Sequence, residues 1–351
     1  MPCNQFSHSK FLNMHRKKII ITGCCGTIGH GLLKYLANNS GLYDAILGID
    51  NNESGLFILE REFGNNFKFA FGDIRDKERL VQLFKDVHTV IHTAALKHVA
   101  PCEIAPEEAI KTNILGVNNI ISAARQTGVS KVLFTSSDKA VNPTNVMGTS
   151  KLMGERLMSA AQIDCGNYGN TTFFSTRFGN VLGSHGSVFP LFAKQIRQGG
   201  PVTITDPDMT RFVMSTEDAV SLVMESLDLA HGGEVFVSRM PAIRISDLAD
   251  VMIETFAPRF GYQAEDIKVD IIGRKPGEKI YEELLTEEES TRTLQLDKFF
   301  VVLPAFRNFY ELDYNYTGSV EHPVGQTYCS NNQQLLDRNQ LKSYLLRNGL
   351  L

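Results

Sequence analysis

The sequence predicts an α/β protein of the Rossmann type, with a doubly wound parallel sheet followed by a smaller C-terminal substrate-binding lobe. Apolar runs alternate with helical patterns through the first half of the 351 residues, and such alternation gives a parallel sheet with helices on both faces. A glycine-rich segment, Gly23 to Gly29, separates the first strand from the first helix, and Asp50 ends the second strand. Both features are typical of a dinucleotide site.

The elements of the first half are expected to follow one another in strand and helix order. The apolar run 19–21 marks a strand at 17–22, leucines at helical spacing mark a helix at 27–39, and the run 45–49 marks a strand at 44–50. The pattern then repeats. Helices are expected at 53–63, 77–85, 107–127 and 146–162, and strands at 67–71, 87–93, 131–136 and 172–177.

After residue 180 the chain becomes richer in glycine, proline and short elements. We therefore expect an N-terminal extension (1–16), a dinucleotide-binding domain (17–180), and a region (181–351) that is mainly a substrate-binding lobe with a C-terminal tail. The expected elements of this last region are helices at 187–198, 216–229 and 246–256 and strands at 202–205 and 234–237.

Composition excludes several classes of protein. With 43% hydrophobic and 21% charged residues the chain is typical of a globular protein. Its net charge of −4 argues against a general binder of nucleic acid or anionic membranes. We find no apolar run near the roughly 20 residues that span a bilayer, and residues 1–16 lack the apolar core of a signal peptide. The expected location is the cytoplasm.

Cysteine and histidine spacing gives no indication of a metal site. Six cysteines are scattered without a Cys-x-x-Cys pair, which predicts reduced thiols rather than zinc ligands or disulfides. Cys24 and Cys25 lie inside the glycine-rich segment, where we interpret them as small packing residues. His92, His98 and His185 are not spaced as metal ligands and are interpreted as structural.

The glycine-rich segment predicts how the dinucleotide pyrophosphate is held. Gly23, Gly26 and Gly29 permit a tight turn and a close approach of backbone N–H groups, including those at Thr27 and Ile28. The helix that follows directs its N-terminus at the negative charge.

Asp50 favours NAD over NADP. A carboxylate at the end of the second strand accepts hydrogen bonds from the ribose hydroxyls and repels a 2′-phosphate. NADP remains the alternative cofactor. The alternative role for Asp50 is to cap the helix that begins near Glu53.

Further cofactor contacts are expected after the third and fourth strands. Asp73 and Ile74 lie where an adenine contact is usual, although Asp73 is equally well explained as a turn residue. Ala94 and Ala95 are small residues where backbone must pass close to the nicotinamide ribose. Asn113, within an apolar helix, is expected to satisfy buried backbone beside the fourth strand.

Several further motifs are similar to those of extended short-chain dehydrogenases/reductases. The chain resembles in particular the bacterial nucleotide-sugar 4,6-dehydratases of capsule, O-antigen and protein-glycan pathways that act on UDP-N-acetylglucosamine. The resemblance covers roughly residues 17 to 290, and a tail motif, Tyr328 to Asn332, resembles the capsule-type branch. The matching stretches are Thr22 to Gly29, Ala94 to Val99, Lys111 to Gly116, Ser136 to Val141, Met147 to Lys151, Arg177 to Val181, Thr205 to Phe212 and Pro276 to Glu282.

Two positions depart from the wider pattern. Many relatives carry Ser and Arg after the second strand and use NADP, whereas this chain has Asp50, Asn51 and Asn52, which supports NAD. The superfamily has Tyr-x-x-x-Lys, but the residue four before Lys151 is Met147, which cannot exchange a proton. Some dehydratases of this group share that methionine.

The resemblance implies a redox cycle that consumes no external reductant. Carbon 4 of the sugar is oxidised, the ketone acidifies the proton on carbon 5, the carbon 6 hydroxyl is eliminated, and the hydride returns to carbon 6. The cofactor, which is expected to be bound tightly, is thereby regenerated at each turnover. The cycle needs a base for carbon 5 and an acid for the departing hydroxyl.

The resemblance assigns Lys139 as the base and Asp138 as the acid. In a closed, dry site the pKa of a lysine is expected to fall and that of a carboxyl group to rise. Lys151 is expected to hydrogen-bond the nicotinamide ribose and to favour loss of the carbon 4 hydroxyl proton. Ser137 is the candidate relay for that proton, with Ser136 or a water molecule as alternatives.

Substrate contacts are expected from four residues. Arg211 and Lys97 are candidates to neutralise the diphosphate, and Arg211 is preferred because a guanidinium binds phosphate oxygens in a bidentate fork. Asn180 is expected to bind a phosphate or sugar oxygen, and Glu278, next to Lys279, to contact the nucleotide. The alternative is that the Glu-Lys pair begins a helix on a solvated face.

Two other functions remain open from the sequence. A 4-epimerase would use the same cofactor but would not need Asp138 and Lys139. A non-catalytic dinucleotide-binding scaffold would explain the missing tyrosine, but not the presence of Asp138, Lys139 and Lys151. The resemblance also implies a homo-oligomer. It does not decide the configuration at carbon 5, although the tail motif favours the inverting branch, and it leaves the nucleotide base open.

Overall fold

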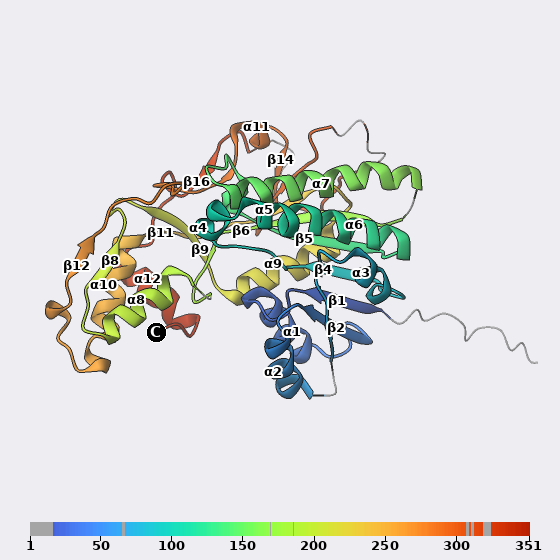
Figure 1. Cartoon of the computed structure of the whole chain (residues 1–351). Coiled ribbons are helices and arrows are strands. Elements are labelled where there is room, and N and C mark those ends of the chain that lie inside the picture. The colour runs from blue at the N-terminus through green and yellow to red at the C-terminus, as the bar shows by residue number, and fades with distance from the viewer. Residues whose placement is uncertain are drawn as a thin grey trace, which may run out of the picture.

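The computed structural model has a large central sheet with helices on both faces and a smaller lobe beside it (Figure 1). The structure describes residues 17–64, 67–168, 170–184, 186–306, 309, 312–318 and 324–351. The expected N-terminal extension and His185 lie outside these ranges. Within the described residues, no helix combines the length and apolar character needed to cross a bilayer.

Six parallel strands form the core of the sheet in the order β3-β2-β1-β4-β5-β6. The order reverses between β1 and β4, and in open α/β sheets a ligand binds at the carboxyl ends of the strands at such a point. The expected strands are confirmed within one or two residues. They are β1 (Lys18–Thr22), β2 (Ala45–Asp50), β3 (Lys68–Phe71), β4 (Thr89–His92), β5 (Lys131–Ser137) and β6 (Thr172–Phe178).

Residues after 180 extend the same sheet. Strand β10 (Val235–Ser238) pairs parallel with β6, and β15 (Phe299–Val302) pairs antiparallel with β10. Strand β14 (Thr293–Gln295) then forms the edge. The central sheet therefore includes segments from both halves of the sequence.

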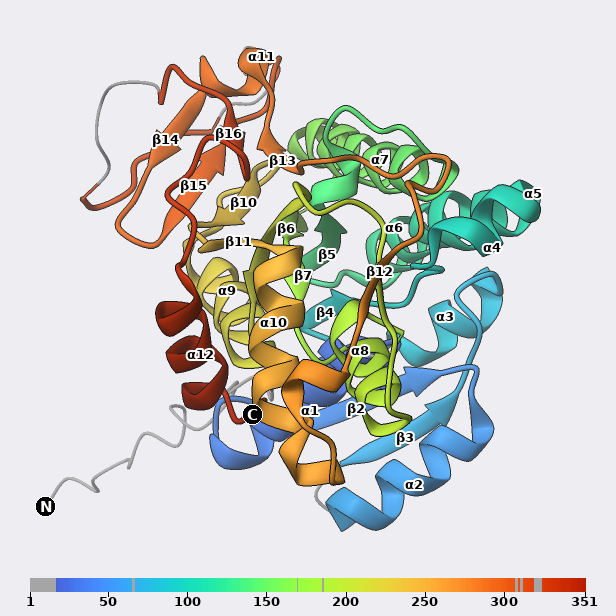
Figure 2. The same cartoon turned by 90° about the vertical axis from the view of Figure 1, so that its left-hand side faces the viewer.

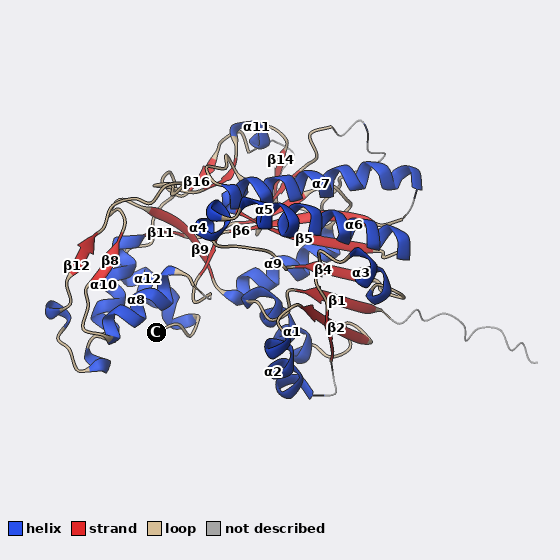
Figure 3. Ribbon diagram, viewed as in Figure 1, coloured by secondary structure: helices blue, strands red, loops and turns tan. Residues whose placement is uncertain are grey.

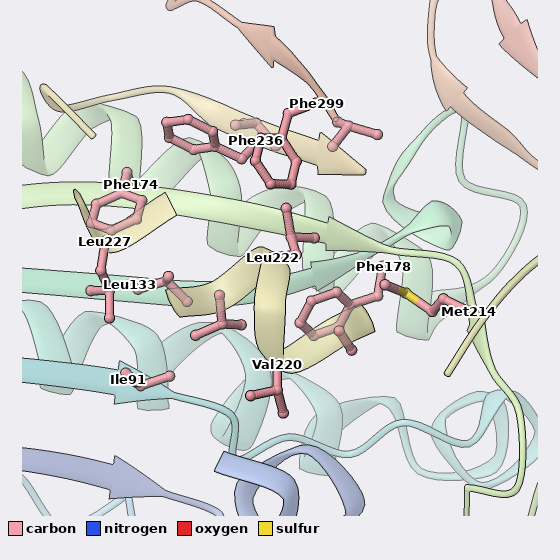
Figure 4. Packing of buried hydrophobic residues seen from close by; sticks show 14 of the residues in the cluster. Ile91, Leu133, Phe174, Phe178, Met214, Val220, Leu222, Leu227, Phe236 and Phe299 are labelled. Carbon is pink, nitrogen blue, oxygen red and sulfur yellow. The ribbon is translucent and has the colours of Figure 1, made fainter. Parts of the chain in front are cut away.

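Successive strand residues pack into two separate layers, as the alternation of side chains in a strand requires. Ile19 and Ile21 face α1, α2 and α9, whereas Ile20 faces α3, α6 and α7. Figure 4 shows the first layer, where α9 lies against β4, β5, β6 and β10. The covering helices are α1 (Thr27–Asn38), α2 (Glu53–Phe63), α3 (Lys77–Leu83), α6 (Gly116–Thr127), α7 (Val146–Tyr168) and α9 (Thr216–Leu229).

The smaller lobe has its own hydrophobic core, to which α8, α10 and α12 contribute, and lies at one end of the sheet (Figure 2). Strands β7, β9 and β11 form a small sheet, and β8 pairs with β12. The tail strand β16 (Tyr328–Cys329) pairs with β13 (Glu283–Leu285). The remaining bounds are β7 (Asn180–Val181), α8 (Val188–Arg197), β8 (Val202–Ile204), β9 (Thr210–Met214), β11 (Ala242–Arg244), α10 (Ile245–Phe256), β12 (Val269–Ile271), α11 (Glu287–Ser290) and α12 (Arg338–Arg347).

The helices predicted at 107–127 and 146–162 differ from the structure (Figure 3). The second one, α7, is longer than expected and ends at Tyr168. The single helix expected at 107–127 is a succession of α5 (Pro106–Ala109), a π-helical segment (Ile110–Leu115) and α6, and it is preceded by α4 (Val99–Ile104). No local pattern in the residues predicts the wider π turn. Nor does a helix begin at the Glu-Lys pair, because the segment between β12 and β13 forms turns and loop.

Candidate functional site

The turn after β1 has the geometry that a dinucleotide pyrophosphate needs. Gly23 has φ of 70°, and a Cβ there would lie 2.6 Å from the amide nitrogen of Ala94. A Cβ on Gly29 would lie 2.4 Å from the carbonyl oxygen of Gly23. Gly26 precedes α1, and no side chain caps this helix end. Larger residues at positions 23 and 29 would thus collide with protein backbone, so the tight turn needs glycine there. The first N–H groups of α1 have no side-chain cap, and a dinucleotide pyrophosphate fits this helix end.

Asp50 lies at the end of β2 and is held by backbone. Its Oδ2 accepts a 3.0 Å hydrogen bond from the amide of Cys25, and its Oδ1 accepts one of 3.0 Å from Asn52. Asn52, not Asp50, caps α2, because its side chain accepts a hydrogen bond from Gly55 N at 3.0 Å. The alternative role of Asp50 as the helix cap is therefore wrong.

Asp73 is a turn residue in the structure, whatever else it contacts. Its carboxylate accepts hydrogen bonds from Arg75 Nε and Nη2 at 3.0 and 2.7 Å, and these hydrogen bonds lower its pKa to about 2. The next residue, Ile74, is buried against Gly116. Because its side chain belongs to the core, a contact with adenine would have to come from its backbone atoms.

Small residues after β4 lie against the glycine turn, and their expected contact with the nicotinamide ribose stays a prediction. Ala94 and Ala95 are half-buried, and the backbone of Ala94 contacts Gly23. Asn113 is buried on the π-helical segment and satisfies both backbone groups of Leu96, accepting from its N–H at 2.8 Å and donating to its carbonyl at 2.9 Å. Asn113 thus fixes the loop after β4, the backbone role expected of it.

Lys151 on α7 is buried beneath the carboxyl end of β5. Its Nζ donates a 2.9 Å hydrogen bond to the carbonyl of Thr135 and lies 4.7 Å from the ring centroid of Phe134. Burial lowers the pKa of Lys151 to about 8, against the opposing effect of Glu155. His92 lies nearby, with Nδ1 at 2.7 Å from Thr22 Oγ1, and burial lowers its pKa to about 3.

Asp138 and Lys139 follow β5 and form a close ion pair. Lys139 Nζ lies 3.0 Å from Asp138 Oδ1, and the same oxygen accepts a 2.6 Å hydrogen bond from Ser137 Oγ. Asp138 is fully buried, whereas a quarter of the Lys139 side chain is exposed. Ser136 Oγ is buried and has no hydrogen-bond partner among the described residues. Ser137, rather than Ser136, is therefore connected to the acid.

The pKa of Lys139 is raised, which corrects the expectation that it is lowered. Burial alone would lower it, but the charges of Asp138 and Glu282 outweigh burial. In the resting site Lys139 is therefore an ammonium ion. It can act as a base only after a neighbouring carboxylate has gained a proton or has been displaced.

Glu282 is a site residue that sequence reasoning did not single out, although it ends one of the motifs that carry the resemblance. It is buried, and its Oε1 lies 3.7 Å from Lys139 Nζ and 3.6 Å from Arg211 Nε. Asn180 Oδ1 lies 3.5 Å from the same ammonium. These residues line a cavity of about 660 Å³ between the sheet and the smaller lobe.

The predicted substrate residues are only partly brought together. Arg211, Asn180 and Glu278 line this cavity, but Lys97 does not. The Arg211 guanidinium donates to the carbonyls of Thr210, Lys279 and Ile280 at 2.7, 2.8 and 3.1 Å. Its fork is thus directed at protein backbone, and binding a diphosphate would require these bonds to be exchanged.

Met147 and the two adjacent cysteines were predicted to be packing residues. Met147 is buried in a small cluster with Cys102 and Ala109, as a packing residue would be. Cys24, Cys25 and Asp50 bring ligand atoms within 4.8 Å of one another. Burial raises the pKa of Cys25 to about 12 and that of Cys24 further, so both thiols stay protonated and the trio is a poor metal ligand set.

Comparison with known proteins agrees with this geometry. An uncharacterized membrane protein of Methanocaldococcus jannaschii is 45% identical over 94% of this chain and 95% of its own length. A Campylobacter jejuni protein named UDP-N-acetylglucosamine 4,6-dehydratase (inverting) is 39% identical, covering 83% of this chain and 84% of its own. A Rickettsia bellii protein named UDP-glucose 4-epimerase is 36% identical over 94% of this chain and 95% of its own.

The similarity extends to solved structures and to a family model. The X-ray structure of Pen from Bacillus thuringiensis superposes with a TM-score of 0.88 at 38% identity, covering 95% of this chain and 98% of that one. The model of the family described as polysaccharide biosynthesis protein matches residues 19–304. The chain belongs to this polysaccharide biosynthesis protein family, and is an extended short-chain dehydrogenase/reductase of the capsule and O-antigen type.

Proposed function

We propose that the protein is a nucleotide-sugar 4,6-dehydratase that converts UDP-N-acetylglucosamine into a UDP-4-keto-6-deoxy-N-acetylhexosamine. The observation that carries the proposal is the buried pair of Asp138 and Lys139, which lies beside Ser137 at the wall of the cavity. An enzyme that only oxidises and reduces carbon 4 needs no such acid and base. The name of the Campylobacter jejuni relative supports the same activity and inversion at carbon 5.

The proposed cofactor is NAD, held by the glycine turn, Asp50 and Lys151. When bound, it would accept the hydride from carbon 4 and later return it to carbon 6. The Asp50 carboxylate is positioned by Cys25 and Asn52 at the end of β2, where a 2′-phosphate would meet its charge.

Ser137 and Asp138 provide a path for the first proton. The Ser137 hydroxyl already donates to Asp138 Oδ1. It can therefore take the proton of the carbon 4 hydroxyl while it passes its own proton to the carboxylate, which leaves Asp138 as a carboxylic acid. Lys151, buried beneath the end of the same strand β5, keeps positive charge near this step.

Protonation of Asp138 also prepares Lys139 as the base. Lys139 loses its nearest opposite charge at that moment, and its pKa falls. Its proton then passes to water in the cavity, to which a quarter of the Lys139 side chain is exposed. The neutral amine can take the carbon 5 proton while Asp138 returns its proton to the departing carbon 6 hydroxyl, which leaves as water. The raised pKa of the resting lysine is thus compatible with its proposed role.

A 4-epimerase is the second candidate, because a relative with that name covers nearly the whole chain. Incubation of the purified protein with UDP-N-acetylglucosamine in deuterated water, followed by proton NMR, separates the candidates. A 4-keto-6-deoxy product with deuterium at carbon 5 supports the dehydratase, and its configuration reports inversion. A galacto-configured product supports the epimerase, and no turnover supports a binding scaffold. The homo-oligomer expected from the resemblance stays a prediction.

A further inference from the structure

Glu282 places a second carboxylate against Lys139. Only 3% of the residue is exposed, and its Oε2 has no hydrogen-bond partner among the described residues. Its Oε1 lies between the Lys139 ammonium at 3.7 Å and Arg211 Nε at 3.6 Å. A buried carboxylate between two cations at the wall of the cavity stabilises the charged form of both cations.

The C-terminal tail holds Glu282 through Ser330. The backbone amide of Glu282 donates to Ser330 Oγ at 3.0 Å, and Ser330 N donates to the Glu282 carbonyl at 2.9 Å. Ser330 Oγ also lies 2.9 Å from Thr210 Oγ1, next to Arg211. The fully buried Ser330 therefore links the tail to both β9 and the segment that carries Glu282.

The charged groups around Lys139 come from three segments. Asp138 adjoins it after β5, Glu282 precedes β13, and Arg211 lies on β9. The carboxylates favour the ammonium form, and Arg211 opposes it. Lys279 also acts on Glu282, but its Nζ is bound to the carbonyl of Val141 at 2.8 Å.

We propose that Glu282 is a positioning residue for Lys139, which holds the ammonium beside Asp138 and delays its loss of a proton, and that Ser330 makes the tail part of the site by fixing Glu282. The consequence for catalysis rests on the proposed function, but the charge relationship does not. Burial raises the pKa of Glu282, and the charges of Lys139 and Arg211 oppose that rise. When Asp138 becomes an acid, Glu282 is the carboxylate left beside Lys139.

The test measures how readily Lys139 becomes neutral, without use of turnover. Cyanate carbamylates neutral amines, so the full-length protein is treated with cyanate from pH 7 to 11, and modification of Lys139 is followed by peptide mass spectrometry. Because the pKa of Lys139 is raised, this range covers the rising part of the curve of reactivity against pH. Glu282→Gln should displace that curve toward lower pH by about 1 unit, since an opposite charge within ~4–6 Å shifts a pKa by about 1–3 units. At a given pH on this part of the curve, the lysine should react up to about tenfold faster.

Glu283→Gln is the matched control. Glu283 is the next residue, and its carboxylate lies 3.6 Å from Lys279 Nζ and accepts from Asn142, away from Lys139. This variant should leave Lys139 reactivity unchanged. Equal curves for wild type and Glu282→Gln, or an equal shift in Glu283→Gln, overturn the proposal.

Two further variants keep the test decisive if Glu282→Gln is poorly folded. Glu282→Asp retains the charge and should displace the reactivity curve by less than about half the displacement in Glu282→Gln. Ser330→Ala should displace the curve in the same direction as Glu282→Gln. An undisplaced curve in Ser330→Ala removes the tail from the proposal. Absence of any turnover of UDP-N-acetylglucosamine would refute the proposed function while leaving the cyanate result intact.

Discussion

The backbone amide of Cys25 donates a 3.0 Å hydrogen bond to Asp50 Oδ2, which joins the glycine turn after β1 to the end of β2. A second amide, that of Asn52, holds the other carboxylate oxygen. Two bonds from different segments fix the orientation of Asp50. The carboxylate therefore has a defined place relative to the turn that is proposed to hold the pyrophosphate.

We predict that the protein binds NAD more tightly than NADP, because a 2′-phosphate would meet the Asp50 carboxylate. Asp50→Ser should reduce the difference in affinity between NAD and NADP. Calorimetric titration with each dinucleotide measures both effects. Asp44→Ser, at an exposed carboxylate that accepts from Lys17 N, is the control and should not alter the preference. Tighter binding of NADP by the unaltered protein would refute the role of Asp50.

Met147→Leu should retain most of the turnover, because Met147 packs against Cys102 and Ala109 and exchange between Met and Leu costs less than about 1.5 kcal/mol. Lys151→Met should be far more damaging, since it removes the buried cation beneath β5. Steady-state rates with UDP-N-acetylglucosamine compare the two. A similar loss of steady-state rate in both variants would show that Met147 does more than pack against its neighbours.

Lys139→Ala should stop product formation and carbon 5 exchange, yet still permit some hydride transfer from carbon 4, visible as absorbance of the reduced cofactor. The reason is that the proposed base acts after oxidation. Deuterium exchange at carbon 5 is followed by proton NMR. Exchange at the wild-type rate in this variant would remove Lys139 from the mechanism.

Asp138→Asn should slow dehydration by about 10²–10⁴-fold, the usual contribution of a positioned acid, while carbon 5 exchange survives. The amide keeps the shape of the side chain but cannot deliver a proton to the departing hydroxyl. Product formation and exchange are measured in the same NMR experiment. A rate of dehydration near that of the wild type would contradict the assignment.

Lys151 should make stability depend on pH between about 8 and about 10.4, the interval between its lowered pKa and the usual value for lysine. Below pH 8 both states hold the proton. Above it the folded protein has released the proton and the unfolded chain still binds it, so the free energy of unfolding should rise with pH. The measurement is the difference in unfolding free energy between wild type and Lys151→Met as a function of pH. A difference that does not change with pH would contradict the lowered pKa.

Arg177→Leu should destabilise the protein by about 3–5 kcal/mol, because it leaves two buried carboxylates without their partner. The guanidinium of Arg177 donates to Glu155 and Glu289 at 2.7–2.8 Å, and 1% of it is exposed. Lys111→Leu, which removes an exposed ion pair with Glu108, is the control and should have little effect. Urea titration of both variants supplies the comparison.

Local sequence signals predicted the first six strands and the glycine turn, because buried parallel strands are continuous apolar runs and the turn needs glycine. They did not predict that β15 and β14 complete the sheet. Pairing between distant segments depends on tertiary packing, which a run such as Phe299 to Val302 does not specify.

The same distinction applies to the candidate site. Asp138 and Lys139 are neighbours in the chain and could be recognised together. Glu282 lies beside Lys139, and Ser330 beside Glu282, only in the folded chain, where β13 pairs with β16. Nothing in the spacing of the sequence linked them to Lys139. The raised pKa of Lys139 follows from the charge of its neighbour Asp138 together with that of Glu282, which the sequence did not link to it.

The order of strands in the sheet has a consequence for synthesis of the protein. Strand β10 is flanked by β6 on one side and by β15 on the other, and β15 is translated more than sixty residues after β10 begins, at Phe299–Val302. A chain emerging from the ribosome therefore presents an open sheet edge at β10 and an Arg177 without Glu289. Chaperone binding during translation is expected to be strongest in that interval, and a nascent chain that stops before β15 should aggregate where the finished one does not.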